Sequence, residues 1–123
     1  MAVRFKNVAP RLIAKDVVKT AEWYRENLGF TILRLYSETN PEYALLERDG
    51  VEIHLTKGEV LPKDNDNMLY IRVSGIDELY AECVKRRLVH PNGPLQLKPW
   101  RQREFSVLDR NGALLTFGEP PTE

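Results

Sequence analysis

The chain has 123 residues, of which 42% are hydrophobic and 29% charged, as expected for one globular domain. Its 18 Lys and Arg balance 18 Asp and Glu, so there is no electrostatic reason to expect nucleic acid or an anionic membrane as a partner. Cys83 is the only cysteine, which excludes an intrachain disulfide, and no apolar run is long enough to span a bilayer. Because residues 1–10 also lack the apolar stretch of a signal peptide, we expect a cytoplasmic location.

The first half of the chain predicts a strand, a helix and three further strands. The opening strand is expected over residues 8–14, and Asp16 can cap a helix by accepting its free amides. Apolar residues then recur at helical spacing up to Leu28, and Gly29 is a typical residue for ending a helix. Three strand-like runs follow, over residues 30–36, 43–48 and 51–56.

The second half predicts the same order of elements. A strand is expected over residues 68–73, and Ser74 with Asp77 resembles a capping box at the start of a helix that ends near Arg87. Three weaker strands follow, over residues 95–98, 104–108 and 113–117. Residues 119–123 are expected to be frayed.

Each half also contains a hairpin signal between its last two strands, Asp49-Gly50 in the first and Asn111-Gly112 in the second. The chain therefore has the order βαβββ twice. A doubly wound parallel sheet is not expected, because its helices would alternate with every strand.

The strand over residues 51–56 has two unlike faces, because successive side chains of a strand point to opposite sides. One face carries Val51, Ile53 and Leu55, and the other carries Glu52, His54 and Thr56. We expect the apolar face to pack under a helix. The mixed faces of such strands would line a concave binding surface.

Several segments resemble the vicinal-oxygen-chelate superfamily. They are residues 10–16 (PRLIAKD), 22–24 (EWY), 28–30 (LGF), 103–105 (REF) and 109–112 (DRNG). Others are similar to the bleomycin resistance proteins in particular, namely residues 74–82 (SGIDELYAE), 99–100 (PW) and 103–105 (REF). The resemblance covers nearly the whole chain.

The resemblance implies a single α+β domain over residues 1–123. It would consist of two βαβββ modules, over about residues 1–60 and 61–123, that form a cupped mixed sheet with the helices on its outer face. It also implies a homodimer, in which the segment before Pro10 crosses to the partner. A plain strand-opening proline explains Pro10 equally well.

Enzymes of this superfamily hold a divalent metal at four strand positions. By resemblance, these positions are occupied here by Ala9, His54, Met68 and Thr116. Only His54 is a good ligand, and a catalytic ion usually needs three protein ligands, so Glu52 on the same face would not complete a site. We therefore expect no metal and no cofactor, and we interpret His54 as a residue that lines the site or bonds to a neighbour.

The resemblance implies a groove at the dimer interface, between two subunits and lined by aromatic residues, that binds a bleomycin-type antibiotic without chemical change. Carried over by position, the groove residues are Arg34, Tyr43, Tyr70 and Trp100, with His54 and Thr56 nearby. Trp100 lies outside the strand pattern, which favours a ligand or a partner over the core as its contact. Cys83 lies on the apolar stripe of a helix and is expected to be buried and structural.

Two other functions remain open from the sequence. One is a metal-dependent lyase, dioxygenase or transferase, and the other is the binding of a different planar or anionic small molecule. Arg34 stands where the resistance proteins can carry an aromatic ring. A guanidinium would repel a cationic drug, although its planar group can also stack.

Overall fold

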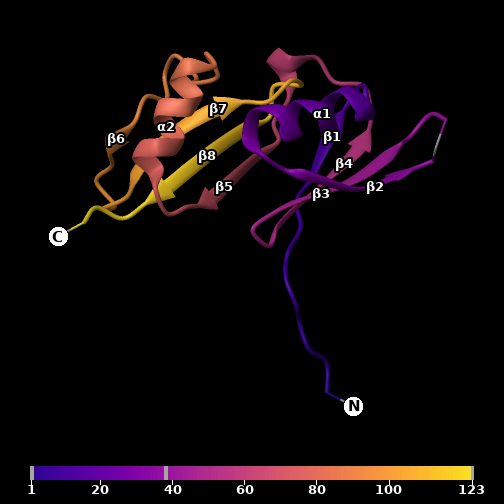
Figure 1. Cartoon of the computed structure of the whole chain (residues 1–123), viewed down its shortest axis with the longest axis horizontal. Coiled ribbons are helices and arrows are strands. Elements are labelled where there is room, and N and C mark those ends of the chain that lie inside the picture. The colour runs from indigo at the N-terminus through magenta and orange to yellow at the C-terminus, as the bar shows by residue number, and fades with distance from the viewer. Residues whose placement is uncertain (1, 38, 123) are drawn as a thin grey trace. The chain divides into compact units, whose positions relative to one another are not determined.

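The computed structural model describes residues 2–37 and 39–122 (Figure 1). The chain divides into two compact units, Met1–Glu59 and Val60–Glu123. Each has its own sheet and its own helix, so we describe them in turn.

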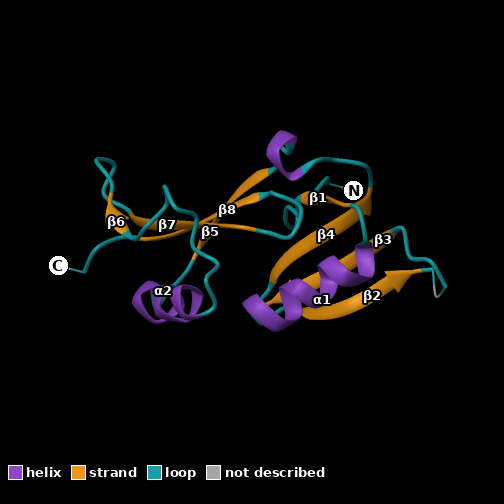
Figure 2. Cartoon of the chain, turned by 90° about the horizontal axis from the view of Figure 1, so that it is seen from above, coloured by secondary structure: helices purple, strands orange, loops and turns teal. Residues whose placement is uncertain are grey.

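Unit 1 is a four-stranded sheet covered by one helix. Its elements are β1 (Arg11–Ala14), α1 (Val17–Leu28), β2 (Thr31–Tyr36), β3 (Tyr43–Arg48) and β4 (Val51–Lys57). The strands lie in the order β1-β4-β3-β2, with β1 parallel to β4 and the other pairs antiparallel. Figure 2 shows α1 lying along one face of this sheet. The other face is open and carries the mixed side chains.

Unit 2 repeats this arrangement after a short 3-10 turn, η1 (Pro62–Asp64). Its elements are β5 (Met68–Arg72), α2 (Ile76–Lys85), β6 (Gln96–Leu97), β7 (Arg103–Leu108) and β8 (Leu114–Glu119). The strand order is β5-β8-β7-β6, with β5 parallel to β8. The predicted α+β fold with two βαβββ modules is thus confirmed, and each helix packs on one face of its own sheet. That the modules together form one cupped sheet stays a prediction.

The core of unit 1 follows from the predicted alternation and caps. Ile53 and Leu55 are fully buried, whereas the alternating residues of β4 face the open side. The Asp16 carboxylate accepts the amide of Lys19 at 3.0 Å and starts α1. Gly29 ends the helix with φ 70°, in the left-handed region that favours glycine.

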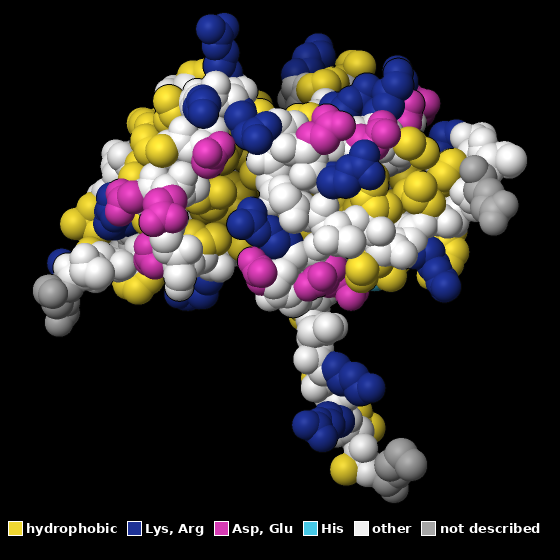
Figure 3. All heavy atoms as spheres, in the orientation of Figure 1, with side chains coloured by type: hydrophobic (Ala, Val, Ile, Leu, Met, Phe, Trp, Pro, Cys, Tyr) yellow, Lys and Arg dark blue, Asp and Glu magenta, His cyan; other side chains and the backbone are white. Residues whose placement is uncertain are grey.

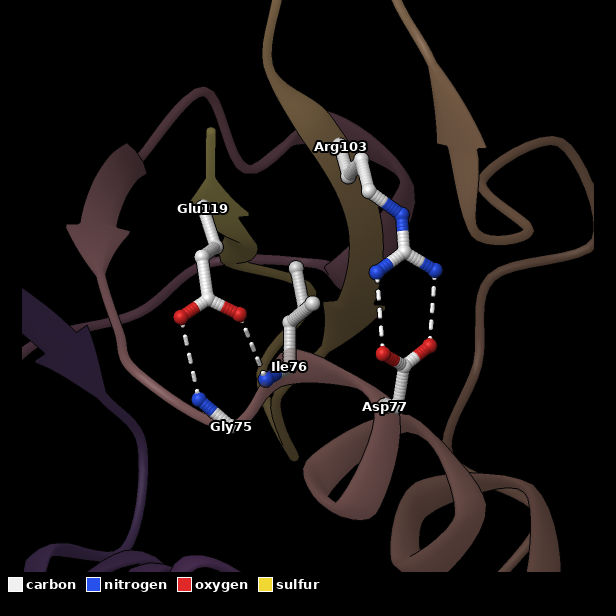
Figure 4. Close-up of polar contacts among 5 residues, drawn as sticks. All are labelled: Gly75, Ile76, Asp77, Arg103 and Glu119. Carbon is white, nitrogen blue, oxygen red and sulfur yellow. Dashed lines mark hydrogen bonds and ion pairs between the residues drawn. The ribbon is translucent and has the colours of Figure 1, made fainter. Parts of the chain in front are cut away.

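Helix α2 begins differently from the prediction, and the expected capping box of Ser74 and Asp77 is wrong. The amides of Gly75 and Ile76 donate to the two carboxylate oxygens of Glu119, each at 3.1 Å (Figure 4). Asp77 instead accepts two hydrogen bonds from Arg103, at 2.7 and 2.9 Å. Glu119 therefore belongs to β8 and holds a helix end, and it is not part of a frayed tail.

Other element boundaries also shift. The opening strand covers only Arg11–Ala14, because residues 2–10 form an arm without secondary structure that extends away from the sheet of unit 1 (Figure 1). Val3, Phe5 and Val8 on this arm are 89%, 93% and 86% exposed. Such exposure of apolar side chains favours a partner that covers the arm.

Candidate binding site

The most organised polar cluster on an open sheet face centres on Glu104 of β7. The Glu104 side chain is only 6% exposed. Its Oε2 atom accepts a hydrogen bond from the Tyr70 hydroxyl at 2.8 Å and another from the Trp100 Nε1–H at 2.7 Å. One carboxylate oxygen thereby fixes the polar ends of two aromatic side chains.

Gly118 makes this arrangement possible. It lies on β8, between β5 and β7, and is paired with both Arg72 and Glu104. A Cβ atom at Gly118 would overlap the hydroxyl and ring of Tyr70, so the absence of a side chain leaves room for the phenol. Tyr70 therefore crosses over β8 to reach the carboxylate on β7. We call Tyr70, Trp100, Glu104 and Gly118 the Glu104 cluster.

Trp100 is placed by a tight loop between β6 and β7. The amide of Lys98 donates to the Gln102 carbonyl at 2.8 Å, and the amide of Arg101 donates to the Lys98 carbonyl at 2.9 Å. Because Gln96 pairs with Glu104 at the base of this hairpin, the loop folds Trp100 back toward Glu104. The indole is 62% exposed, so its face is available to a ligand or partner and is not part of the core.

The electrostatics of Tyr70 follow from this placement. Burial of the hydroxyl raises the pKa of Tyr70, and the hydrogen bond to Glu104 raises it further. The phenol therefore stays protonated near neutral pH and acts as a hydrogen-bond donor to the carboxylate.

The open face of unit 1 carries a different chain of contacts. The Tyr43 hydroxyl lies 2.7 Å from Nδ1 of His54, and Nε2 of His54 lies 2.6 Å from the Glu52 carboxylate. The carboxylate can only accept, so Nε2 carries a proton and, in the neutral ring, Nδ1 accepts from Tyr43. The interpretation of His54 as a residue bonded to its neighbours is confirmed. Thr56 lies opposite Tyr43 in the register.

Arg34 joins this face through Tyr36, which sequence reasoning missed. Its guanidinium carbon lies 5.5 Å from the centroid of the Tyr36 ring, close enough for a cation–π contact. The ring centroids of Tyr36 and Tyr43 lie 6.3 Å apart in an edge-on arrangement, because the two residues are register partners on β2 and β3. The strand pairing was the signal that could have identified Tyr36.

The residues at the positions implied by resemblance, on either unit, do not fit a catalytic divalent ion. Of the four positions implied by resemblance, only His54 can ligate well, and both of its ring nitrogens already have partners. The hydroxyl of Thr116 is bonded to that of Ser106 at 2.8 Å. Within residues 2–37 and 39–122, no three His, Cys, Asp or Glu side chains converge as a metal site would require.

Cys83 is 1% exposed, and burial raises its thiol pKa to about 11. Such a thiol is poorly suited to nucleophilic attack, as expected for a structural cysteine.

The structure thus brings the predicted residues together in two sets, one on each unit. Tyr70 and Trp100 share a carboxylate, and Arg34, Tyr43, His54 and Thr56 lie on neighbouring strands of the other unit. Glu104 and Gly118 were missed as site residues. Glu104 was visible in the sequence as part of the segment 103–105 (REF), but nothing there indicated that its carboxylate bonds to Tyr70 and Trp100.

Comparison with known proteins identifies the family. The model of the Glyoxalase/Bleomycin resistance protein/Dioxygenase superfamily matches residues 4–117, and the chain belongs to this superfamily. The bleomycin resistance protein of Geobacillus stearothermophilus is 29% identical over 125 aligned positions, which cover 88% of this chain and 92% of the relative. The predicted resemblance to the bleomycin resistance proteins is therefore confirmed.

Two solved structures support the fold. The bleomycin resistance determinant encoded on the transposon Tn5 superimposes with a TM-score of 0.80 at 19% identity, covering 96% of this chain and all of that one. The bleomycin-binding protein of Streptomyces verticillus, complexed with copper(II)-bleomycin, gives 0.77 at 23% identity, covering 98% of this chain and all of that one. At these identities the likeness shows the fold alone.

Two global properties bear on partners. On the face drawn in Figure 3, basic and acidic side chains are interspersed and do not form one extended basic area. Among the described residues, no helix is both long and apolar enough to cross a membrane.

Proposed function

We propose that this protein binds and sequesters a bleomycin-type antibiotic in the cytoplasm, as a homodimer and without chemical change to the ligand. The observation that carries the proposal is the Glu104 cluster, in which a buried carboxylate holds an exposed indole and a phenol on an open sheet face. Relatives named as bleomycin resistance proteins align over 88% of the chain and support the same function.

The chemistry of the cluster suits a flat, cationic ligand such as bleomycin. An exposed indole offers a face on which a planar ring can stack, and aromatic stacking contributes about 0.5–1.5 kcal/mol beyond buried area. The negative faces of Trp100 and Tyr70 also attract organic cations. Binding of this kind needs no nucleophile and no metal.

The N-terminal arm supports the dimer. Three apolar side chains on residues 2–10 are more than four-fifths exposed, and they would be covered if the arm lay on a second protomer. The resemblance to the bleomycin resistance proteins implies that the segment before Pro10 crosses to the partner. We propose the same exchange for this chain.

A second candidate function is the binding of a planar anionic molecule on unit 1. The observation that favours it is Arg34, which is exposed and lies over the Tyr36 ring. A guanidinium beside an aromatic ring can pair with a carboxylate or phosphate. A metal-dependent enzyme is the weaker alternative, because His54 and Glu52 bond to each other.

Calorimetry tests the proposal directly. Purified protein is titrated with copper-loaded and with metal-free bleomycin, and the bound metal of the same batch is measured. We expect submicromolar binding of one ligand per subunit and recovery of unmodified drug. The Trp100→Ala variant should lose most of this affinity. No heat, together with no protection of DNA from bleomycin cleavage, would rule out the drug.

A further inference from the structure

Glu104 is a buried carboxylate that has no cationic partner among residues 2–37 and 39–122. Its two hydrogen bonds come from a phenol and an indole, which are neutral donors. The basic residue next to it, Arg103, points to the helix side of the sheet and pairs with Asp77. A buried charge is normally paired with an opposite charge, because removing it from water is costly.

The second oxygen of Glu104 is available. Both hydrogen bonds end on Oε2, and within the described parts of the chain Oε1 has no donor. Oε1 of Glu104 is also not fully enclosed. Among the described residues, the fully enclosed side-chain atom without a hydrogen-bond partner is Oε1 of Gln102, and Oε1 of Glu104 is not such an atom. An acceptor that is buried, charged and open on one side is suited to a donor from outside the chain.

We propose that Glu104 is the specificity-determining residue of the site, and that its free oxygen pairs with an organic cation such as a guanidinium, amidinium or ammonium group of the ligand. The cation lies beside the exposed indole of Trp100 and the ring of Tyr70, whose negative faces add to the attraction. A neutral ligand can form a hydrogen bond to the free oxygen, but it gains neither the charge pairing nor the attraction to the two aromatic faces. An anion is repelled by the carboxylate.

Gly118 and the two aromatic donors orient the acceptor. The Tyr70 hydroxyl and the Trp100 Nε1–H both hold Oε2, so the carboxylate cannot turn without breaking two hydrogen bonds. The direction in which Oε1 faces is thus set before the ligand arrives. Such preorganisation lowers the entropy that the ligand interaction has to overcome.

This inference deepens the proposed function, because bleomycin is itself cationic, but it can be tested without bleomycin. Benzamidinium and benzamide have the same flat shape and differ in charge. Each is titrated into labelled protein, and the Trp100 Nε1–H resonance is followed by NMR. In the wild type, we expect benzamidinium to shift this resonance at about tenfold lower concentration than benzamide, as a charge-assisted hydrogen bond requires.

The Glu104→Gln variant removes the charge and keeps an oxygen that can accept from Tyr70 and Trp100. We expect it to bind both probes equally weakly while its melting temperature stays close to that of the wild type. Glu82→Gln, on the exposed side of α2, is the matched control and should keep the preference for benzamidinium.

Three results would overturn the inference: equal titration of the two probes in the wild type, no shift by benzamidinium up to its solubility limit, or a preference that survives in Glu104→Gln. The comparison within the wild type does not depend on how the variant folds. Bleomycin binding is measured on the same proteins. Loss of the proposed function would appear as no bleomycin binding by the wild type. Failure of the inference alone would appear as equal bleomycin binding by wild type and Glu104→Gln.

Discussion

The two units share one topology but use their open faces differently. In unit 1, Tyr43, His54 and Glu52 form a chain in which each group bonds to the next along neighbouring strands. In unit 2, two aromatic donors converge on one oxygen of Glu104, and the other oxygen has no donor among the residues that the structure describes. The same scaffold can therefore carry one face whose polar groups bond to each other and one that, as we propose, is prepared for a ligand.

The two units also differ in how their helices begin. Helix α1 is capped by Asp16, three residues from the amide that it binds. Helix α2 is capped by Glu119, which lies 43 residues beyond Ile76. The start of α1 therefore depends on a local contact, whereas the start of α2 depends on a residue far along the chain.

The largest effect is expected when the path of Tyr70 over β8 is blocked. Gly118→Ala places a methyl group where the phenol lies, and overpacking of this kind costs about 1–3 kcal/mol in the free energy of unfolding. Urea denaturation measures the cost. Gly58→Ala in unit 1 is the control and should cost less, because its Cβ would meet only a methyl group of Ile13, at 3.1 Å.

A double variant tests whether the loss of stability in Gly118→Ala comes from overlap between the added methyl group and Tyr70. Gly118→Ala combined with Tyr70→Ala should cost less than the two single changes added together, because the smaller side chain removes the overlap. Simple additivity would mean that Gly118 matters for some other reason.

The next effect contrasts the two helix caps. Glu119→Ala leaves the amides of Gly75 and Ile76 without their acceptor, and we expect a loss of about 1–2 kcal/mol in the free energy of unfolding. Asp16→Ala removes one bond and should lose about 1 kcal/mol. Thermal unfolding followed by circular dichroism gives both values. If Glu119→Ala left the free energy of unfolding unchanged, water would be an adequate replacement for Glu119 as the acceptor of these two amides.

A smaller effect is expected within the chain of contacts on unit 1. Tyr43→Phe removes the hydrogen bond to Nδ1 of His54 and should cost about 0.5–1.5 kcal/mol in the free energy of unfolding. Tyr36→Phe, whose hydroxyl is exposed and 3.5 Å from Arg34, is the matched control with little expected loss. Equal losses in the two variants would contradict the view that the half-buried contacts of Tyr43, His54 and Glu52 hold this face together.

The smallest effect concerns the exposed ion pair of unit 2. Two hydrogen bonds from Arg103 hold the pKa of Asp77 below its ordinary value of 3.8. The stability from this pair is therefore fully present above pH 3.8 and is lost as the pH falls through the lowered pKa. Melting temperatures of wild type and Asp77→Asn should differ slightly at neutral pH and converge in acid.

Glu22→Gln, in the looser pair with Arg25 at 3.9 Å, is the control for this titration. Because this pair is exposed and its atoms are further apart, the substitution should change the melting temperature little. If the melting temperatures of wild type and Asp77→Asn still differed in strong acid, the charge of the carboxylate would not be the cause of the difference.

The sequence predicted those parts of the molecule that depend on nearby residues. Asp16, Gly29 and the Asp49-Gly50 turn all act within a few positions of themselves, and all three predictions are confirmed, with φ 51° and 85° in the turn. The apolar alternation of β4 likewise identified its buried face. The resemblance to a known family supplied the topology that local signals could not.

The sequence could not predict contacts that arise only when distant strands pair. Tyr70 and Glu104 are 34 residues apart, and they meet because β8 lies between their strands and carries glycine at the point of crossing. The capping box at Ser74 failed for the same reason. Its local pattern was real, but Glu119 is a better acceptor for the helix amides and Arg103 engages Asp77.

The distant cap of α2 has a consequence for synthesis on the ribosome. Unit 1 contains every residue that starts and ends its helix by position 29, so α1 can be completed while the rest of the chain is still being translated. Helix α2 lacks its acceptor until Glu119 has been made and has left the exit tunnel. We expect the nascent protein to acquire its first unit before its second, which has to wait until Glu119 has emerged.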